Sequence, residues 1–501
     1  MSWAYEKVST RSSGIILHPT SLPGPYGIGD LGSAAYAWVD TLAQAKQKWW
    51  QILPLGPTGY ADSPYQCFSA FAGNPLLVNP EALRDDGLID AGDLEGWSLP
   101  AERVDFGPVI ERKNRLLQRA WQNYQQGRAG HLRSELDGFL RQHHAWLSDF
   151  ALFMALKDAQ QGKSWQDWPR PLRLRDPQAL ATARGELAGG MGLHQFGQFL
   201  FFRQWRRLRD YAHQKGIRII GDIPIFVSAD SADIWANPQF FQLDEERRSR
   251  FVAGVPPDYF SATGQLWGNP LYDWAALERA NFGWWVARFQ ALLELVDIVR
   301  FDHFRGFEGY WEVPAGRPDA VVGRWVKAPG AALLATVEKA LGRLPIIAED
   351  LGVITPEVLA LRERFKLPGM RVLQFAFGDK PTNAYLPHNY DANTVVYTGT
   401  HDNDTTRGWY RATAEKERDH VRRYLARDGS DVAWDFIRTA WSSVADCAIA
   451  PLQDVLNLGA EARMNTPGRA AGNWSWRFQA PQLHAALLAR LAELTELYGR
   501  A

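Results

Sequence analysis

Cysteine is nearly absent from this chain, which has only Cys67 and Cys447 among its 501 residues. Two cysteines cannot build the disulfide framework of a small secreted domain, and their scarcity fits a reducing compartment. Residues 1–14 contain no apolar segment of the kind that a signal peptide needs. We therefore expect a cytoplasmic protein.

Long apolar runs and an excess of one charge are also missing. No run approaches the 18 or more apolar residues of a membrane-spanning helix, so we expect no membrane association. The chain has 55 Lys and Arg against 56 Asp and Glu, a formal net charge of −1. Nucleic-acid surfaces normally need clustered excess basic residues, so we expect no nucleic-acid partner.

Aromatic residues, in contrast, are abundant, with 22 Trp, 16 Tyr and 25 Phe. Most of them are expected to pack in a large aromatic core. The alternative is that some form flat platforms for ligands with hydroxyl groups at their edges, such as sugars.

Short apolar runs predict eight strands. Most are continuous Val, Ile and Leu runs, the pattern of parallel strands that are covered on both faces. They lie at residues 14–18, 49–55, 217–227, 296–304, 344–350, 370–375, 394–400 and 448–455.

Helical patterns lie between several of these runs, at 196–211, 281–295, 331–341 and 356–365. Alternation of strand and helix indicates an α/β protein, and eight strands favour a closed (β/α)₈ TIM barrel. An open doubly wound sheet is the alternative, but no Gly-x-Gly-x-x-Gly follows an early strand.

The chain is about twice as long as a plain barrel, which needs roughly 250 residues. We therefore expect residues 1–501 to form one catalytic barrel unit with large insertions. The main one is about 56–216, between the second and third strands. It is expected to be mostly helical, with helices near 110–126 and 132–159.

Four acids occupy the ends of predicted strands: Asp222, Asp302, Glu349 and Asp402. A carboxylate beside a buried strand is costly unless it has a partner or a solvated pocket. The loops at the carboxyl ends of barrel strands build the active site in this fold. A salt bridge or helix cap would explain any one of these acids, but four at one rim favour function.

Neighbouring residues suggest different roles for the acids. Arg300 lies two residues before Asp302, on the same strand face, and a cation there lowers the pKa of the carboxyl, which suits a nucleophile. Glu349 follows three apolar residues, 346–348, whose surroundings raise its pKa and suit a general acid. Two such carboxylates cleave glycosidic bonds, and a third, Asp402, can stabilise the transition state.

His401 and Asp402 lie together in a tight turn, where both can reach sugar hydroxyls. A metal site is the alternative, but no second His lies at ligand spacing, so we expect no metal. Asp350, next to Glu349, is expected to point the other way by strand alternation.

Three ordered motifs carry a resemblance to a known family: Arg-Phe-Asp-His-Phe-Arg-Gly at 300–306, Ala-Glu-Asp-Leu-Gly at 348–352 and Tyr-Thr-Gly-Thr-His-Asp-Asn at 397–403. They resemble the α-amylase superfamily. More narrowly, they are similar to the 4-α-glucanotransferases of glycoside hydrolase family 77, called amylomaltase or disproportionating enzyme. Further matching stretches, at 18–29, 53–60, 62–66, 254–260, 264–270 and 463–468, extend the resemblance over almost the whole chain.

The resemblance implies a role for each acid: Asp302 as nucleophile, Glu349 as acid/base, and Asp402 as the acid that distorts the sugar. It also implies a set of residues that hold the substrate. These are Arg300, Asp222 and His401 around the transferred sugar, Tyr65 stacked beneath it, Trp267 in a lid, Tyr60 as a remoter aromatic, and His303, Asn465, Ser63 and Phe375 along the cleft.

The lid is expected in a long loop at about 254–274, which has Gly254, Gly264 and Gly268 and carries Trp267. An ordinary aromatic-rich loop packed on the barrel is the alternative. One departure from the family pattern is visible, because Asp379 stands one position later than the acid expected directly after Phe377.

The resemblance implies a retaining 4-α-glucanotransferase (EC 2.4.1.25) that works through a covalent glycosyl-aspartate. Its substrates would be malto-oligosaccharides, starch or glycogen, with a glucan or glucose as acceptor and cyclic glucans as a further product. It implies no metal or organic cofactor, and we expect a monomer. The alternatives are a hydrolase on the same scaffold and a non-catalytic glucan-binding protein, which would lack at least one of the three acids.

Overall fold

Eight parallel strands close into a barrel in the computed structural model, which describes residues 11–257, 261–378 and 380–501. The strands follow one another around the barrel in chain order. They are β1 (Ser12–Ile16), β2 (Trp49–Gln51), β3 (Arg218–Pro224), β6 (Ile298–Asp302), β9 (Ile346–Ala348), β10 (Gly369–Val372), β11 (Thr394–Tyr397) and β12 (Cys447–Pro451). The predicted TIM barrel is confirmed, and the open-sheet alternative is wrong.

Side chains fill the barrel interior, as the fold requires. Alternate residues of the strands point inward and form one apolar cluster that includes Ile220, Ile298, Ile347 and Val395. The intervening residues point outward to the surrounding helices. Both faces of each strand are therefore buried, which explains why the strands read as continuous apolar runs.

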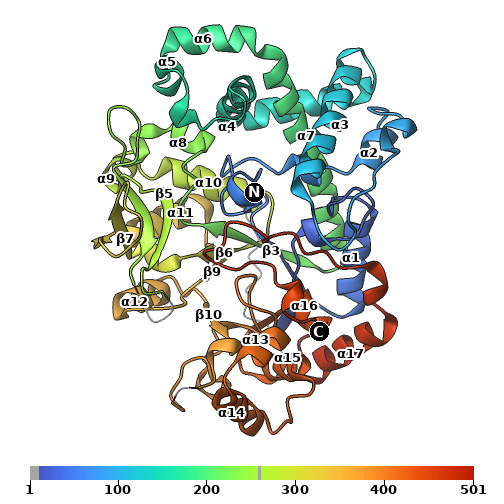
Figure 1. The fold of residues 1–501 in the computed structure, drawn as a ribbon, viewed down its shortest axis with the longest axis vertical. Coiled ribbons are helices and arrows are strands. Elements are labelled where there is room, and N and C mark those ends of the chain that lie inside the picture. The colour runs from blue at the N-terminus through green and yellow to red at the C-terminus, as the bar shows by residue number, and fades with distance from the viewer. Residues whose placement is uncertain (1–10, 258–260, 379) are drawn as a thin grey trace.

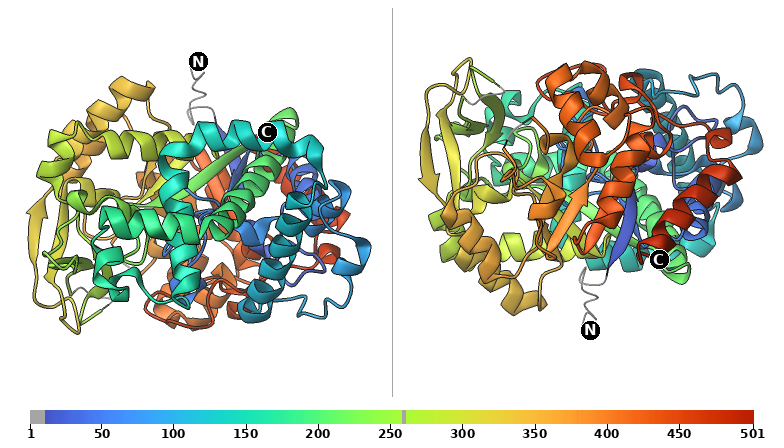
Figure 2. Two further views of the ribbon diagram at one scale, coloured as in Figure 1. Left: turned by 90° about the horizontal axis from the view of Figure 1, so that it is seen from above. Right: turned by 90° about the horizontal axis from the view of Figure 1, so that it is seen from below.

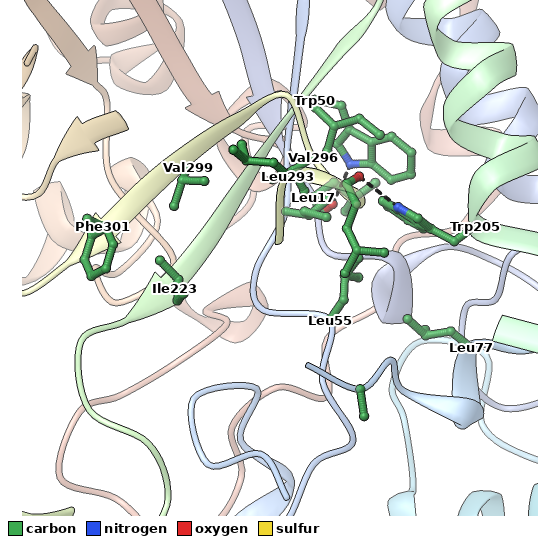
Figure 3. Packing of buried hydrophobic residues seen from close by; sticks show 14 of the residues in the cluster. Leu17, Trp50, Leu55, Leu77, Trp205, Ile223, Leu293, Val296, Val299 and Phe301 are labelled. Carbon is green, nitrogen blue, oxygen red and sulfur yellow. Dashed lines mark hydrogen bonds between the residues drawn. The ribbon is translucent and has the colours of Figure 1, made fainter. Parts of the chain in front are cut away.

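Helices pack around the barrel: α1 (Ser33–Gln44), α7 (Ala188–Gln214), α10 (Gly283–Leu293), α11 (Gly330–Leu341), α12 (Pro356–Arg364), α15 (Val432–Ser442) and α17 (Ala485–Leu497). Figure 3 shows part of this packing, where Trp50 donates to the carbonyl of Leu17 and Trp205 to that of Leu295. These two buried indole N–H groups thus have carbonyl partners, which keeps their burial favourable.

Residues 56–216 contain α2 (Pro80–Asp85), α3 (Phe106–Gln125), α4 (Arg133–Ala159), α5 (Arg170–Arg173) and α6 (Pro177–Glu186) as well as α7. Figure 1 shows α3 to α6 above the barrel, with α4 next to α8 (Ala232–Ala236). The C-terminal part, with α13 (Thr406–Ala412), α14 (Glu415–Leu425) and α16 (Leu452–Val455), lies below it.

A second, antiparallel sheet lies at one edge of the molecule (Figures 1 and 2), in the order β5-β4-β7-β8. Its strands are β4 (Phe251–Val255), β5 (Gln265–Pro270), β7 (Gly309–Pro314) and β8 (Arg324–Lys327). Two of them precede β6 in the chain and two follow it. The short helix α9 (Trp274–Arg279) comes after β5.

This sheet corrects the expectation of one continuous loop at 254–274. Gly254 lies at the end of β4, and Gly268 and Trp267 lie in β5. Glycines and Pro270 made the segment look like a loop, whereas pairing with residues 309–314, far along the chain, makes it a sheet. Residues 258–260 of the expected lid, and Asp379, lie outside the described residues.

No helix in the described part of the chain is both long and apolar enough to cross a membrane. Within the same residues, no group of three or more His, Cys, Asp or Glu side chains is arranged to hold a metal ion.

Candidate active site

The predicted acids meet at the carboxyl ends of the barrel strands. Strands β3 and β6 pair so that Asp222 lies opposite Arg300, and Pro224 lies opposite Asp302. Glu349 follows the last residue of β9 directly, and Asp402 lies in the turn after β11. The barrel register therefore brings acids from four strands to one rim.

Arg300 is at the centre of this arrangement. Its Nη1 donates to Asp222 Oδ2 at 2.6 Å and to Asp302 Oδ1 at 3.0 Å. The Arg300 and Asp222 side chains are buried, whereas the Asp302 side chain is 30 % exposed. Burial alone would lower the pKa of Arg300, but Asp222 and Asp302 outweigh it and raise the pKa, so Arg300 stays cationic.

The pKa of Asp302 is higher than the expectation from the sequence, in which the nearby Arg300 lowers it. Burial raises the pKa of Asp302 to about 6, and the guanidinium of Arg300 only partly opposes this shift. Near neutral pH the carboxylate is still ionised, which a nucleophile requires.

Glu349 has the higher pKa of the two. Burial, reinforced by the charge of Asp302, raises the pKa of Glu349 to about 7. Its carboxyl group accepts hydrogen bonds from the backbone N–H of His303 at 2.7 Å and of Leu351 at 2.9 Å. At a pH between these two pKa values, Glu349 is mostly protonated and Asp302 is mostly ionised.

The backbone at His303 makes the contact to Glu349 possible. His303 has a left-handed conformation, with φ of 56°, just after β6 and before a 3-10 turn at Phe304–Phe307. Its ring lies edge-on to Trp267, with ring centroids 4.7 Å apart. Trp267 on β5 thus reaches the residue that positions Glu349.

Asp402 is the most acidic of the three. Burial alone would raise its pKa, but His401 Nε2 at 3.3 Å and Asn465 Nδ2, which donates at 2.6 Å, hold the pKa well below its usual range. The turn that carries it is closed by Asn403, whose Oδ1 accepts from the N–H and the hydroxyl of Thr400 at 2.9 Å. The carboxylate of Asp402 is therefore ionised near neutral pH.

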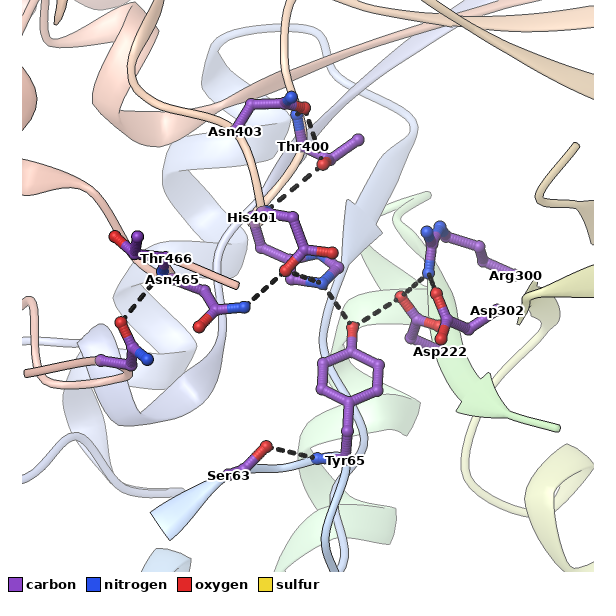
Figure 4. A network of polar contacts seen from close by, with 12 residues as sticks. Ser63, Tyr65, Asp222, Arg300, Asp302, Thr400, His401, Asn403, Asn465 and Thr466 are labelled. Carbon is purple, nitrogen blue, oxygen red and sulfur yellow. Dashed lines mark hydrogen bonds and ion pairs between the residues drawn. The ribbon is translucent and has the colours of Figure 1, made fainter. Parts of the chain in front are cut away.

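Tyr65 joins these groups into one polar network (Figure 4). Its hydroxyl donates to Asp222 Oδ2 at 3.0 Å and lies 2.8 Å from His401 Nε2. Because the phenol has one proton, His401 Nε2 must be the donor in the second contact. The two rings are stacked, 5.2 Å apart and 16° from parallel, and Ser63 Oγ accepts from the Tyr65 N–H.

Asp454 fixes the loop that bears His401 and Asp402, although no pattern in the sequence marks this residue. This buried carboxylate lies in the short helix α16, directly after β12, and accepts from the hydroxyl of Thr398 at 2.6 Å. It also accepts from the N–H and the hydroxyl of Thr406, both at 2.7 Å. Asp454 therefore ties both ends of the loop 398–406.

Most predicted site residues belong to this network or touch it, but two do not. Tyr60 has a side chain that is 73 % exposed, and Phe375 packs edge-on against Tyr385, with ring centroids 5.5 Å apart. Asp350 turns away from the rim, as strand alternation predicts, and pairs with Arg362 of α12 at 2.5 Å.

Two further residues beside the site, Trp474 and Arg463, were not among the predicted site residues. The ring of Trp474 lies 5.8 Å from that of Tyr65, and Arg463 Nη2 donates to the Asp402 carbonyl at 2.7 Å. Both come from the C-terminal segment, where no strand signals their approach to the rim. A hollow lies beside the network, with Tyr65 and Asp222 in its wall.

Comparison with known proteins places the whole chain in one family. The glycoside hydrolase 77 family model, described as 4-alpha-glucanotransferase, matches residues 17–483. A 4-alpha-glucanotransferase of Thermus thermophilus is 53 % identical over 497 residues, which cover 97 % of this chain and 99 % of the relative. One from Synechocystis is 50 % identical over 495 residues, 98 % of each chain.

Solved structures agree. The amylomaltase from Streptococcus agalactiae in complex with acarbose superposes with a TM-score of 0.95 at 40 % identity, covering 98 % of this chain and all of that one. The amylomaltase from Corynebacterium glutamicum, at 18 % identity, shares the fold with a TM-score of 0.78, over 98 % of this chain and 75 % of that one.

Proposed function

The chain belongs to the 4-alpha-glucanotransferase family, glycoside hydrolase family 77, and we propose that it transfers segments of α-glucans by double displacement through a covalent glycosyl-aspartate at Asp302. The observation that carries the proposal is the pairing of an ionised Asp302 with a neighbouring Glu349 of higher pKa.

In the first step Asp302 attacks the anomeric carbon of the donor sugar. The bond from that carbon to the 4-oxygen of the leaving glucan breaks, and Glu349 gives its proton to this oxygen. The backbone N–H groups of His303 and Leu351 then stabilise the carboxylate that Glu349 becomes.

In the second step the 4-hydroxyl of an acceptor glucan takes the place of the leaving group. Glu349 removes the hydroxyl proton, the acceptor oxygen attacks the anomeric carbon, and the bond to Asp302 breaks. Two displacements at one carbon return it to its original configuration. Asp302 is then ionised and Glu349 protonated again, so the cycle closes.

The remaining polar network would hold the transferred sugar. Asp402, kept negative by His401 and Asn465, is suited to stabilise positive charge at the sugar ring in the transition state. Tyr65 and His401 offer a stacked aromatic pair, and Asp222 a carboxylate for hydroxyl groups. Arg300 links Asp222 to Asp302, so sugar binding and nucleophile position depend on one side chain.

Transfer rather than hydrolysis needs an acceptor that is held in place while water is kept out. Trp267 supports this part of the proposal because its ring touches His303, whose N–H is bound to Glu349. An indole here would cover the side of the cleft where water or acceptor must enter.

The substrate class follows from the relatives. The Streptococcus agalactiae amylomaltase was solved with acarbose, and the relatives are called 4-alpha-glucanotransferases. We propose malto-oligosaccharides, starch or glycogen as donors, glucans or glucose as acceptors, and cyclic glucans as a further product. A monomer in the cytoplasm remains our expectation, and both cysteines are free thiols, as a reducing compartment would leave them.

Incubation with maltotriose and sizing of the products test this function. A transferase produces glucose together with a ladder of longer glucans, and Asp302→Asn should produce neither. Products no longer than maltotriose, with glucose and maltose accumulating, would instead identify a hydrolase. A normal ladder from Asp302→Asn would remove Asp302 from the role of nucleophile.

A further inference from the structure

One row of side chains crosses the antiparallel sheet at the edge of the molecule. The strand register places Trp325 of β8 opposite Trp311 of β7, and Trp311 opposite Gly254 of β4. Residues directly opposite one another in antiparallel strands point to the same face. The neighbours Tyr310 and Glu312 point to the other face and are buried, so the two tryptophans lie on the outer face.

Exposed apolar side chains concentrate around this row. Nine large apolar residues in the described part of the chain are exposed, and five of them lie on or beside the sheet. They are Leu266, Val321, Val322, Trp325 and Val353. Trp325, at 44 %, is the only tryptophan of that set. A cluster of exposed apolar groups with an aromatic centre usually marks a binding surface.

The indole of Trp325 is held in place. The guanidinium carbon of Arg305 lies 3.9 Å from its ring centroid, and the ring of Trp311 meets it at 5.4 Å and 65°. Trp311 is fixed in turn, since its Nε1 donates to the Ala320 carbonyl at 2.9 Å. A ring that is already ordered loses little conformational freedom when a ligand stacks on it.

The same surface is continuous with the rim of the cleft. Arg305 Nη1 donates to the Val353 carbonyl at 2.5 Å, four residues after Glu349. Arg305 also follows His303 by two residues, and the ring of His303 touches Trp267. A long ligand leaving the cleft on this side would therefore pass over Trp325.

The charges around Trp325 favour an uncharged ligand. Arg324 pairs with Glu312 at 2.8 Å, and Lys327 pairs with Glu308. Carboxylates thus neutralise Arg324 and Lys327, whose exposed N–H groups can still donate to hydroxyls. The third cation, Arg305, is buried against the indole and presents little charge to solvent. An indole face with hydroxyl-binding groups at its margin suits a pyranose ring, which has an apolar face and polar edges.

We propose that Trp325, supported by Trp311 and Arg305, binds a segment of α-1,4-glucan outside the cleft. The indole stacks on a glucose ring of a chain whose other end occupies the active site. The class of ligand rests on the proposed function, but the surface itself does not. Long substrates gain this contact, whereas a trisaccharide confined to the cleft does not.

The test compares long and short donors in Trp325→Ala, with Trp325→Phe as the conservative variant. We expect kcat/KM for amylose, relative to kcat/KM for maltotriose, to fall roughly three- to tenfold in Trp325→Ala, the effect of one aromatic stacking contact. Trp325→Phe should recover most of it. Trp325 is outside the core, so the loss of its contacts to Trp311 and Arg305 should lower the Tm only slightly, and Val444→Ala, another exposed apolar site, is the control.

Suppose that Trp325→Ala leaves the ratio of the two kcat/KM values unchanged while the wild type still converts maltotriose to longer glucans. This result would refute glucan binding at Trp325 but would not affect the proposed function. Failure of the wild type on maltotriose would overturn the function instead. The third outcome is a wild-type dimer that Trp325→Ala converts to a monomer without changing the ratio. It would assign the surface to a second copy of the chain and also reject the proposal.

Discussion

The two sides of the cleft are built in different ways. On the barrel side, Tyr65, Asp222, Arg300 and Asp302 are joined by hydrogen bonds of 2.6 to 3.0 Å and are largely buried. On the side of the antiparallel sheet, Trp267 and Trp325 make ring contacts and are more exposed. Buried charges need fixed partners, which gives precision, whereas aromatic surfaces tolerate several ligand positions. We infer that the barrel side performs the bond exchange and the sheet side governs what can take part in it.

The largest effect expected on the barrel side comes from Glu349→Gln. Loss of the general acid should lower kcat for maltotriose by roughly 10²- to 10⁴-fold. With an α-glucosyl fluoride donor the loss should be much smaller, because fluoride leaves without a proton. Steady-state rates with both donors provide the measurement, and an equal loss on both would remove Glu349 from the acid role.

Asp454→Asn should disturb the barrel side of the cleft, although Asp454 acts only through the loop 398–406 that it holds. An asparagine has only one accepting oxygen. If that oxygen keeps both hydroxyls, the amide NH₂ faces the N–H of Thr406, two donors toward each other, so the loop 398–406 should shift. A misplacement of about 1 Å can cost on the order of 10²-fold, so we expect kcat to fall by roughly 10- to 100-fold. Kinetics with maltotriose should show this fall with KM changed less than about threefold.

Thr398→Val should have a smaller effect on the same loop, since it removes only one of the three hydrogen bonds to Asp454. Its kcat should lie between those of the wild type and Asp454→Asn. A large loss of Tm in Asp454→Asn together with a normal kcat would assign Asp454 to folding alone.

The pH dependence of kcat/KM is the next test of the barrel side. Asp302 must be ionised, and its pKa is raised to about 6, so activity should fall below that pH. Glu349 must be protonated, and its pKa is raised to about 7, so activity should fall above that pH. A narrow bell-shaped profile is therefore expected, with both limbs belonging to the pair rather than to single groups.

Arg300→Gln should move the acidic limb of that profile to higher pH, because the cation opposes the raised pKa of Asp302. The variant also leaves the buried Asp222 without its cationic partner, at a cost of about 3–5 kcal/mol in the free energy of unfolding. Arg362→Gln is the matched control, since Arg362 pairs with Asp350 away from the rim. Its acidic limb should stay in place, and a shift in both variants would contradict the account.

The smallest effect is expected on the sheet side. Trp267→Ala removes the edge-on contact to His303 and opens the cleft to water. The ratio of hydrolysis to transfer should rise roughly three- to tenfold, the scale of one aromatic contact. Quantifying free glucose against longer glucans from maltotriose measures it, and a constant ratio would show that Trp267 does not exclude water.

The same two regions differ in how far the sequence predicts them. Buried parallel strands read as apolar runs, so all eight barrel strands, and with them the meeting of Asp222, Asp302 and Glu349, could be predicted. The antiparallel sheet could not, because Gly254, Gly268 and Pro270 resemble a loop and β4 pairs with a strand beyond β6. Asp454 was missed because a buried carboxylate bound only by Thr side chains and one backbone N–H has no sequence signature.

Trapping the glycosyl-enzyme tests the central claim most directly. A fluorinated glucosyl fluoride that forms the intermediate quickly and releases it slowly would be incubated with the enzyme, and the labelled peptide identified by mass spectrometry. The account predicts one glucosyl group on the peptide that contains Asp302, attached at that carboxylate, and none in Asp302→Asn. A label on another carboxylate, or no label together with products of inverted configuration, would contradict it.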